Sequence, residues 1–216
     1  LKLIYSADLH GNEEFYKRLL DKAGEENANA VVIGGDLGPK GGRTVDDGIN
    51  VKKVLYEKIH VQKIFFEDFM IPLFKEFKDK NPEKKVFLIM GNDDFRKNMQ
   101  TLEKAEKDNI LKLIHNKSVK FNKNLNIAGY SFVNPTPFRL KDWEKPDFED
   151  DKGPIQLFQE QIRSVEREEG TIKDDLEKLK KLSNPKKTIY VIHSPPFNTK
   201  LDVIMTGMHV GSKSVR

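Results

Sequence analysis

The 216-residue sequence contains no cysteine and no long apolar run. Without cysteine the chain forms no disulfide and offers no thiolate to a metal, so a bound metal would be held by His, Asp, Glu or Asn. No apolar stretch approaches the roughly 18 residues that a membrane span needs, and the first residues do not have the pattern of a signal peptide. We therefore expect a cytoplasmic protein with no membrane partner.

The sequence also lacks a concentrated block of basic charge. Its 38 Lys and Arg residues and 34 Asp and Glu residues are spread fairly evenly, for a net charge of +4. Domains that hold nucleic acid by electrostatics usually gather Lys and Arg on one face beside aromatic side chains. The charge pattern therefore carries no strong nucleic-acid signal, and it says nothing of the oligomeric state. The length predicts one domain over residues 1–216.

Short apolar runs that end in polar turns recur along the chain. They lie at residues 3–5, 30–33, 86–90 and 188–192, and such runs are typical of strands buried in a parallel sheet. Between the first three runs, apolar residues recur at helical spacing over 12–27 and 49–70, which predicts two helices. Asn12 is the expected N-cap of the first helix, and Pro72 is expected to end or kink the second. Strand, helix and strand at this spacing predict an α/β fold.

The remaining segments are less regular. We predict a short helix at 102–108, a strand-rich stretch at 110–129, and a charged helix at 154–182 with a break at Gly170. The glycine-rich segment 37–43 fits neither nucleotide-binding motif, so we interpret it as a mobile loop beside the site. Segment 130–152 is rich in Pro and aromatic residues, and we predict a lid or wall over the site. Trp143 and Phe138 either line a substrate pocket or are buried on the core.

Polar residues suited to metal binding follow each of the four predicted strands. They are Asp8 with His10, then Asp36, Asn92 and His193. Because the carboxyl ends of parallel strands lie on one edge of a sheet, we expect these side chains to converge there. In this interpretation Asp8 and His10 bind one ion, Asn92 and His193 bind a second, and Asp36 bridges the two. Two divalent ions roughly 3.5–4 Å apart lower the pKa of a shared water and orient a phosphoryl group.

These motifs together resemble the calcineurin-like metallophosphoesterases, and the compact prokaryotic branch in particular. The motifs are Asp8-x-His10, Gly35-Asp36, Gly91-Asn92-Asp93-Asp94 and His193, in the family's order. The resemblance implies a two-sheet β-sandwich flanked by helices and a site with two divalent metals. It assigns Asp8, His10 and Asp36 to the first metal, and Asp36, Asn92 and His193 to the second. We expect manganese, while iron, zinc, nickel and magnesium stay open.

The resemblance also implies an activity, the hydrolysis of phosphomonoesters or phosphodiesters by a metal-bridging hydroxide. The substrate would be a small-molecule or nucleotide phosphoester. The expected catalytic residues are Asp36, Asn92, Asp93 and His193, and the expected phosphate-binding residues are Asn12, Asn92 and His209. Of the remaining histidines, His115 is predicted to be structural, and His60 is predicted to take part in packing or to lie on the surface.

Two departures from the family pattern support an alternative function. Many members have a leaving-group His where this chain has Asp93, and an ionised Asp is a poorer acid at neutral pH. The family's Gly-His-x-His motif does not occur before Arg216, so we expect that the C-terminal part is missing, with Ser212 as the N-cap of a helix that is cut short. The alternative is a non-catalytic binding or scaffold protein on the same fold, with an incomplete metal site.

Overall fold

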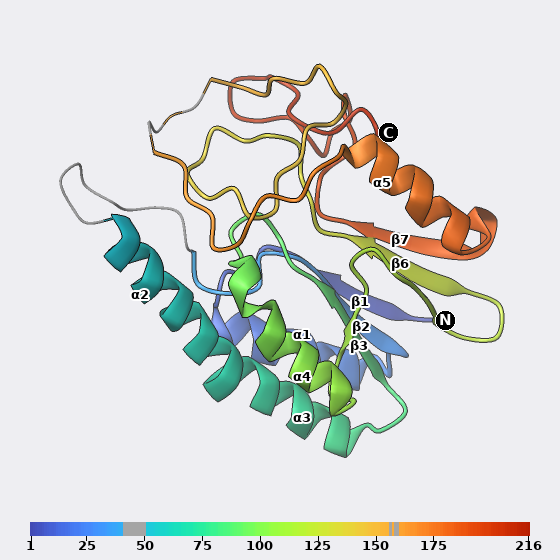
Figure 1. The fold of residues 1–216 in the computed structure, drawn as a ribbon. Coiled ribbons are helices and arrows are strands. Elements are labelled where there is room, and N and C mark those ends of the chain that lie inside the picture. Colours follow the sequence, from blue (N-terminus) through green and yellow to red (C-terminus); the bar gives the residue numbers. More distant parts are fainter. Residues whose placement is uncertain (41–50, 156, 158–159) are drawn as a thin grey trace.

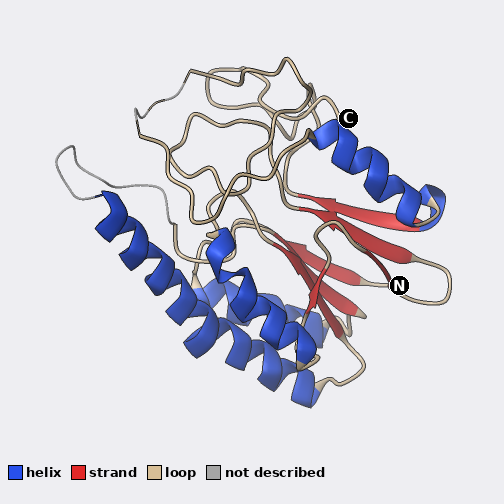
Figure 2. Cartoon of the chain, viewed as in Figure 1, coloured by secondary structure: helices blue, strands red, loops and turns tan. Residues whose placement is uncertain are grey.

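Two β-sheets face each other in the computed structural model, which describes residues 1–40, 51–155, 157 and 160–216. The first sheet is parallel, in the order β1 (Leu3–Ser6), β2 (Ala30–Gly34), β3 (Lys85–Ile89) and β4 (Lys112–Leu113). The second holds β5 (Ser118–Lys120), β6 (Asn126–Tyr130) and β7 (Thr188–Ile192), with β5 antiparallel to β6 and β7 parallel to it. Helices cover the outer faces (Figures 1 and 2). The predicted two-sheet sandwich flanked by helices is confirmed.

Alternation along the strands divides the core into two layers. In β2, Val31 and Ile33 pack with the helices, whereas Ala30 and Val32 belong to a separate cluster shared with the second sheet. Phe87 of β3 lies in this inner cluster too. Successive side chains of a strand point to opposite faces, and both faces of these strands are covered. This is why the runs at 30–33 and 86–90 are continuously apolar.

The first strand differs from the prediction of a fully buried element. Strand β1 pairs only with β2 among the described strands, at one end of its sheet, and the side chain of Tyr5 is 59% exposed. A neighbour on one side only leaves the other side of an edge strand open to water. The apolar run therefore predicted the strand correctly, but it did not predict how far the strand is buried.

The helix predicted over 49–70 continues well past Pro72. Helix α2 (Val51–Ile64) leads into a π-helical turn (Phe65–Met70) and then into α3 (Ile71–Lys80), in which Pro72 lies in the first turn. The N–H of Ile71 bonds to the carbonyl of Phe66, five residues earlier. Proline lacks an N–H and its ring clashes with the carbonyl four residues back in a regular helix, and the wider π-turn relieves this conflict.

The other helices follow the predictions in part. Helix α1 (Glu13–Glu25) begins after Asn12 as expected, and α4 (Met99–Lys107) begins three residues before the predicted 102–108. The helix predicted at 154–182 is wrong for most of its length, because within the described residues of this range the only α-helix is α5 (Ile172–Leu179), with Thr171 as its N-cap. No described helix has both the length and the apolar character needed to cross a bilayer.

The charges of the segment before α5 explain why it is not helical. Ser164 donates from its backbone and its hydroxyl to Asp142, and Glu168 pairs with Arg96 and with Lys145. These long-range partners hold the segment extended against the 130–152 loop.

Segment 130–152 continues from β6 past the strand ends, where the C-terminal loops also lie (Figure 1). Trp143 is 1% exposed and its ring lies 5.2 Å from that of Phe132, so of the two alternatives it is buried on the core, whereas Phe138 is 44% exposed. Asp147 accepts hydrogen bonds from the Ser212 hydroxyl at 2.7 Å and from the Lys213 N–H at 2.6 Å. The predicted mobile loop at 37–43 falls outside the described residues from 41 onward.

Candidate metal centre

The turns after β1 and β2 run side by side and carry three of the predicted ligands. The Asp8 N–H donates to the Gly35 carbonyl at 3.0 Å, and the His10 N–H donates to the Asp36 carbonyl at 2.8 Å. Asp8, His10 and Asp36 all have positive φ angles, of 57°, 46° and 53°. Such backbone costs about 1–3 kcal/mol for a non-glycine residue and persists only where the surroundings impose it. The backbone therefore fixes where these three side chains start.

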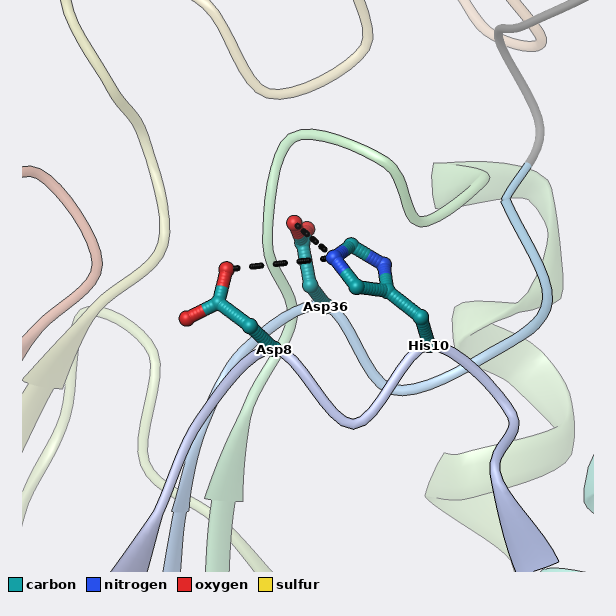
Figure 3. A group of neighbouring side chains, drawn as sticks. All are labelled: Asp8, His10 and Asp36. Carbon is teal, nitrogen blue, oxygen red and sulfur yellow. Dashed lines mark ion pairs between the residues drawn. The ribbon is translucent and has the colours of Figure 1, made fainter. Parts of the chain in front are cut away.

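The three side chains point toward one another (Figure 3). Nε2 of His10 lies 3.6 Å from Oδ2 of Asp36 and 4.0 Å from Oδ1 of Asp8, beyond hydrogen-bonding distance. One ligand atom of each residue lies within 4.8 Å of the other two. Two carboxylates and an imidazole that converge at this spacing match the donors of a divalent cation bound by oxygen and nitrogen.

A second group forms where β7 ends. Nδ1 of His193 donates to the Gly34 carbonyl at 2.7 Å, so in the neutral ring Nε2 carries the lone pair. That Nε2 lies 3.2 Å from Oδ1 of Asn92 and 3.4 Å from Oδ1 of Asp36. Three acceptor atoms therefore face one another, and this arrangement needs either a proton or a cation between them.

The proton affinity of this group follows from the same contacts. Burial alone would lower the pKa of His193, but the hydrogen bond and charge of Asp36 raise it to about 9. Burial would raise the pKa of Asp36, yet its contacts with His193 hold that pKa below its usual value. A cation at this place would replace the proton and keep both groups in their ligand forms.

Asp36 belongs to both groups. Its Oδ2 faces His10 and its Oδ1 faces His193, and its side chain is 5% exposed. This is the arrangement expected of a residue that bridges two ions. One premise of the prediction is wrong, however, because the four strand ends do not share one sheet edge: β7 lies in the second sheet, and the two sheets meet at the site.

At Gly91, just after β3, the backbone lies so close to the predicted ligands that there is no room for a side chain. A Cβ atom built on Gly91 would be 2.2 Å from Oδ1 of Asp36 and 2.6 Å from Nε2 of His193. Next to it, the Asp93 N–H donates to Oδ1 of Asp36 at 2.8 Å. Oδ2 of Asp93 lies 3.8 Å from Nδ1 of His10. The structure thus brings Asn92 and Asp93 to the predicted ligands.

Asp94 supports the site, a role that was not predicted for it from the sequence. It is fully buried and accepts N–H bonds from Leu37 at 2.9 Å, Gly38 at 3.0 Å and Gly91 at 2.9 Å. Burial and the charge of Asp36 raise the pKa of Asp94 to about 7, against the effect of these three donors. It ties the turn after β2 to the turn after β3. Its place in a polar turn directly after a buried strand was a signal for such a role.

Gln62 is a second supporting residue that the sequence did not indicate. It comes from α2, is fully buried, and accepts the Phe95 N–H at 2.8 Å. Its amide donates to the carbonyl of Asp93 at 3.3 Å and to that of Pro39 at 3.3 Å. A glutamine at a helical position has no local feature that distinguishes it from a surface residue, so only the packing of α2 against the turns identifies it.

Asn12 and His209 were predicted to contact phosphate, and the structure places both in other interactions. Oδ1 of Asn12 accepts the Phe15 N–H at 3.2 Å and caps α1. Nδ1 of His209 lies 2.7 Å from Oδ1 of Asp202, and its ring is 5.9 Å from that of Phe197. Within the described residues, these contacts of His209 are with the C-terminal loops and not with the five predicted ligands. Both phosphate contacts stay predictions.

The cap provides a way to separate the two roles of Asn12. Asn12→Ala removes the cap oxygen and should lower the free energy of unfolding by about 1 kcal/mol. Asn12→Ser keeps a cap oxygen but removes the amide, so it should retain most of the stability. Urea denaturation of both variants measures how much the cap contributes to the free energy of unfolding. An Asn12→Ala protein as stable as the parent would contradict the assignment, and a raised KM in both variants would indicate the phosphate contact.

The two remaining histidines lie outside the cluster. His115 is buried among the rings of Tyr130, Phe132 and Trp143, and its Nδ1 accepts the Ser131 N–H at 3.0 Å. Burial lowers its pKa to about 3, so the ring stays neutral. His60 is exposed on α2, stacked on Tyr56.

Comparison with known proteins agrees with this geometry. The family model described as calcineurin-like phosphoesterase matches residues 1–212, while no curated protein matches the chain. One solved crystal structure has a TM-score of 0.63 at 14% identity, covering 99% of this chain and 77% of its own. The protein TT1561 of Thermus thermophilus has a TM-score of 0.56 at 14% identity, covering 99% of this chain and 73% of its own. At such identity these two structures show the fold alone.

The family assignment therefore depends on the family model, which spans nearly the whole chain, and the donors at the strand ends are consistent with it. The chain belongs to the calcineurin-like phosphoesterase family, the members of which are metal-dependent phosphoesterases.

Proposed function

We propose that this protein hydrolyses phosphomonoesters or phosphodiesters of small molecules or nucleotides with two divalent metal ions, manganese being the expected metal. The observation that carries the proposal is the position of Asp36. Its two oxygens face two histidines that come from different sheets, His10 at 3.6 Å and His193 at 3.4 Å. A single buried carboxylate between two imidazoles has the geometry of a bridging ligand.

The residues of each group fit an ion, and their roles follow from their contacts. Asp8, His10 and Asp36 would hold the first ion, and Asp36, Asn92 and His193 the second. Bound there, the ions would supply a water of lowered pKa as the nucleophile and positive charge beside the phosphoryl oxygens. The Gly34 carbonyl keeps the proton of His193 on Nδ1, so that Nε2 stays a ligand. The Asn92 amide brings both a neutral oxygen and an N–H donor for a phosphoryl oxygen.

The protein has no histidine at position 93 that could donate a proton to the leaving group. Asp93 stands there, and an ionised carboxylate does not donate a proton near neutral pH. The protein should therefore act fastest on esters whose leaving group departs without protonation, such as aryl phosphates. This preference distinguishes it from relatives that have a histidine at this position.

Metal removal tests the proposal. The protein is stripped with a chelator, its metal content is determined by elemental analysis, and hydrolysis of aryl phosphomonoesters and phosphodiesters is followed before and after manganese is restored. We expect two ions per chain, no turnover after stripping, and recovery with manganese. The ratio of monoester to diester rates then gives the substrate class. Metal binding without turnover would refute the enzyme and leave the non-catalytic binding protein.

A further inference from the structure

The imidazole of His10 has two nitrogens in very different surroundings. Nε2 faces the carboxylates of Asp8 and Asp36 in the first ligand group. Nδ1 is buried from solvent and has no hydrogen bond within the described residues. A buried N–H without an acceptor costs about 1–3 kcal/mol, so the environment of Nδ1 influences which form the ring adopts.

The form of the ring decides whether His10 can bind a cation. A metal takes the lone pair of a neutral imidazole nitrogen, and the other nitrogen then carries the proton. With Nε2 as the ligand, the proton must sit on Nδ1. An acceptor beside Nδ1 stabilises this tautomer and fixes the plane of the ring.

The carboxylate of Asp93 lies where that acceptor is needed. Its Oδ2 is 3.8 Å from Nδ1 of His10, and its side chain is 18% exposed. The backbone of Asp93 is anchored on both sides, since its N–H donates to Asp36 at 2.8 Å and its carbonyl accepts from Gln62 at 3.3 Å. A shift of about 1 Å at the side chain alone closes the separation to a hydrogen bond.

We propose that Asp93 is a positioning residue whose carboxylate accepts the Nδ1–H of His10, so that Nε2 is held as a ligand for a divalent cation. The same residue orients Asp36 through its backbone N–H, and it therefore aligns two ligands of the first ion. The inference rests on the proposed metal site. It gives position 93 a role in holding the metal instead of protonating the leaving group.

Three variants separate the hydrogen bond from the charge. Asp93→Ala removes both, Asp93→Asn removes the charge but keeps an oxygen acceptor, and Asp79→Ala removes an exposed carboxylate of α3 as the matched control. Zinc affinity is measured by calorimetry on metal-free protein. We expect a loss of about 10- to 100-fold for Asp93→Ala, the range typical of partners that orient a ligand, less than about tenfold for Asp93→Asn, and no change for the control.

Nitrogen-15 NMR of the zinc-loaded protein provides a readout that does not depend on turnover. The His10 signals are assigned by their loss in His10→Gln. The parent and Asp93→Asn should show a slowly exchanging Nδ1–H, and Asp93→Ala should lose it. If Asp93→Ala does not fold, the parent spectrum still decides, because absence of the protected Nδ1–H overturns the inference.

The outcomes distinguish this inference from the proposed function. A parent protein that binds no zinc refutes the metal site and the inference with it. Zinc binding with equal affinity in the parent and Asp93→Ala refutes the inference alone. An equal loss in Asp93→Asn and Asp93→Ala also overturns it, because charge and not the acceptor would then be responsible.

Discussion

Asp36→Asn should lower phosphoesterase turnover by about 10³-fold or more, which equals about 4 kcal/mol of transition-state free energy. The substitution keeps the size of the side chain but removes its charge and one of its two oxygens. In the parent protein each oxygen of Asp36 faces a histidine, Oδ2 toward His10 and Oδ1 toward His193. The variant should therefore bind the two ions far more weakly, and the expected loss exceeds that for any residue outside the ligand groups.

The measurement combines metal stoichiometry with initial rates on an aryl phosphate at saturating manganese. Asp79→Asn, on the exposed face of α3, is the control for the same chemical change away from the site. Circular dichroism verifies that Asp36→Asn is folded. A rate within about tenfold of the parent, with both ions bound, would contradict the bridging role of Asp36.

Lys145→Met should lower the free energy of unfolding by about 3–5 kcal/mol. The Lys145 side chain is 1% exposed, and its Nζ lies 2.7 Å from Oδ2 of Asp175 and 2.9 Å from Oε1 of Glu168. The Tyr130 hydroxyl also donates to Asp175, at 2.8 Å. Removing the ammonium leaves Oδ2 of the largely buried Asp175 carboxylate with one neutral donor, the Tyr130 hydroxyl, and poorly compensated buried charge is the source of the cost.

Lys178 offers a matched control because it approaches the same carboxylate from solvent. Its Nζ lies 3.9 Å from Oδ1 of Asp175, and its side chain is 78% exposed. Lys178→Met should change stability by less than about 1 kcal/mol. The double variant Lys145→Met/Asp175→Leu should recover part of the loss, since the unpaired carboxylate is gone. Urea denaturation of the set measures all three, and a loss below about 1 kcal/mol for Lys145→Met would refute the expectation.

The sequence was most informative where a property is local. An apolar run followed closely by Asp, Asn or His predicted both the strand and a polar side chain of the candidate metal centre, as at Asp8, Asp36 and Asn92. Side-chain alternation and the covering of both faces produce these runs. The start of α1 was equally readable, because the N-cap bond of Asn12 spans only three residues.

Long-range contacts or irregular turns overrode the residue pattern in other segments. Residues 160–170 have helical composition, yet Glu168 is drawn to Arg96 and Lys145, and Ser164 to Asp142. Pro72 did not end its helix, because the π-turn before it accommodates the ring. In each case the local conformation depends on a residue distant in sequence or on an irregular turn that no residue pattern predicts.

The sequence by itself identified the polar residues that converge at the candidate metal centre, since Asp8, His10, Asp36, Asn92 and His193 each follow a strand. Only the tertiary structure decided that His193 arrives from a second sheet, that Asp36 turns one oxygen to each histidine, and that Asp94 and Gln62 hold the turns. The physical reason is that strand and turn signals depend on neighbours in sequence, whereas the packing of two sheets joins strand ends far apart in the chain.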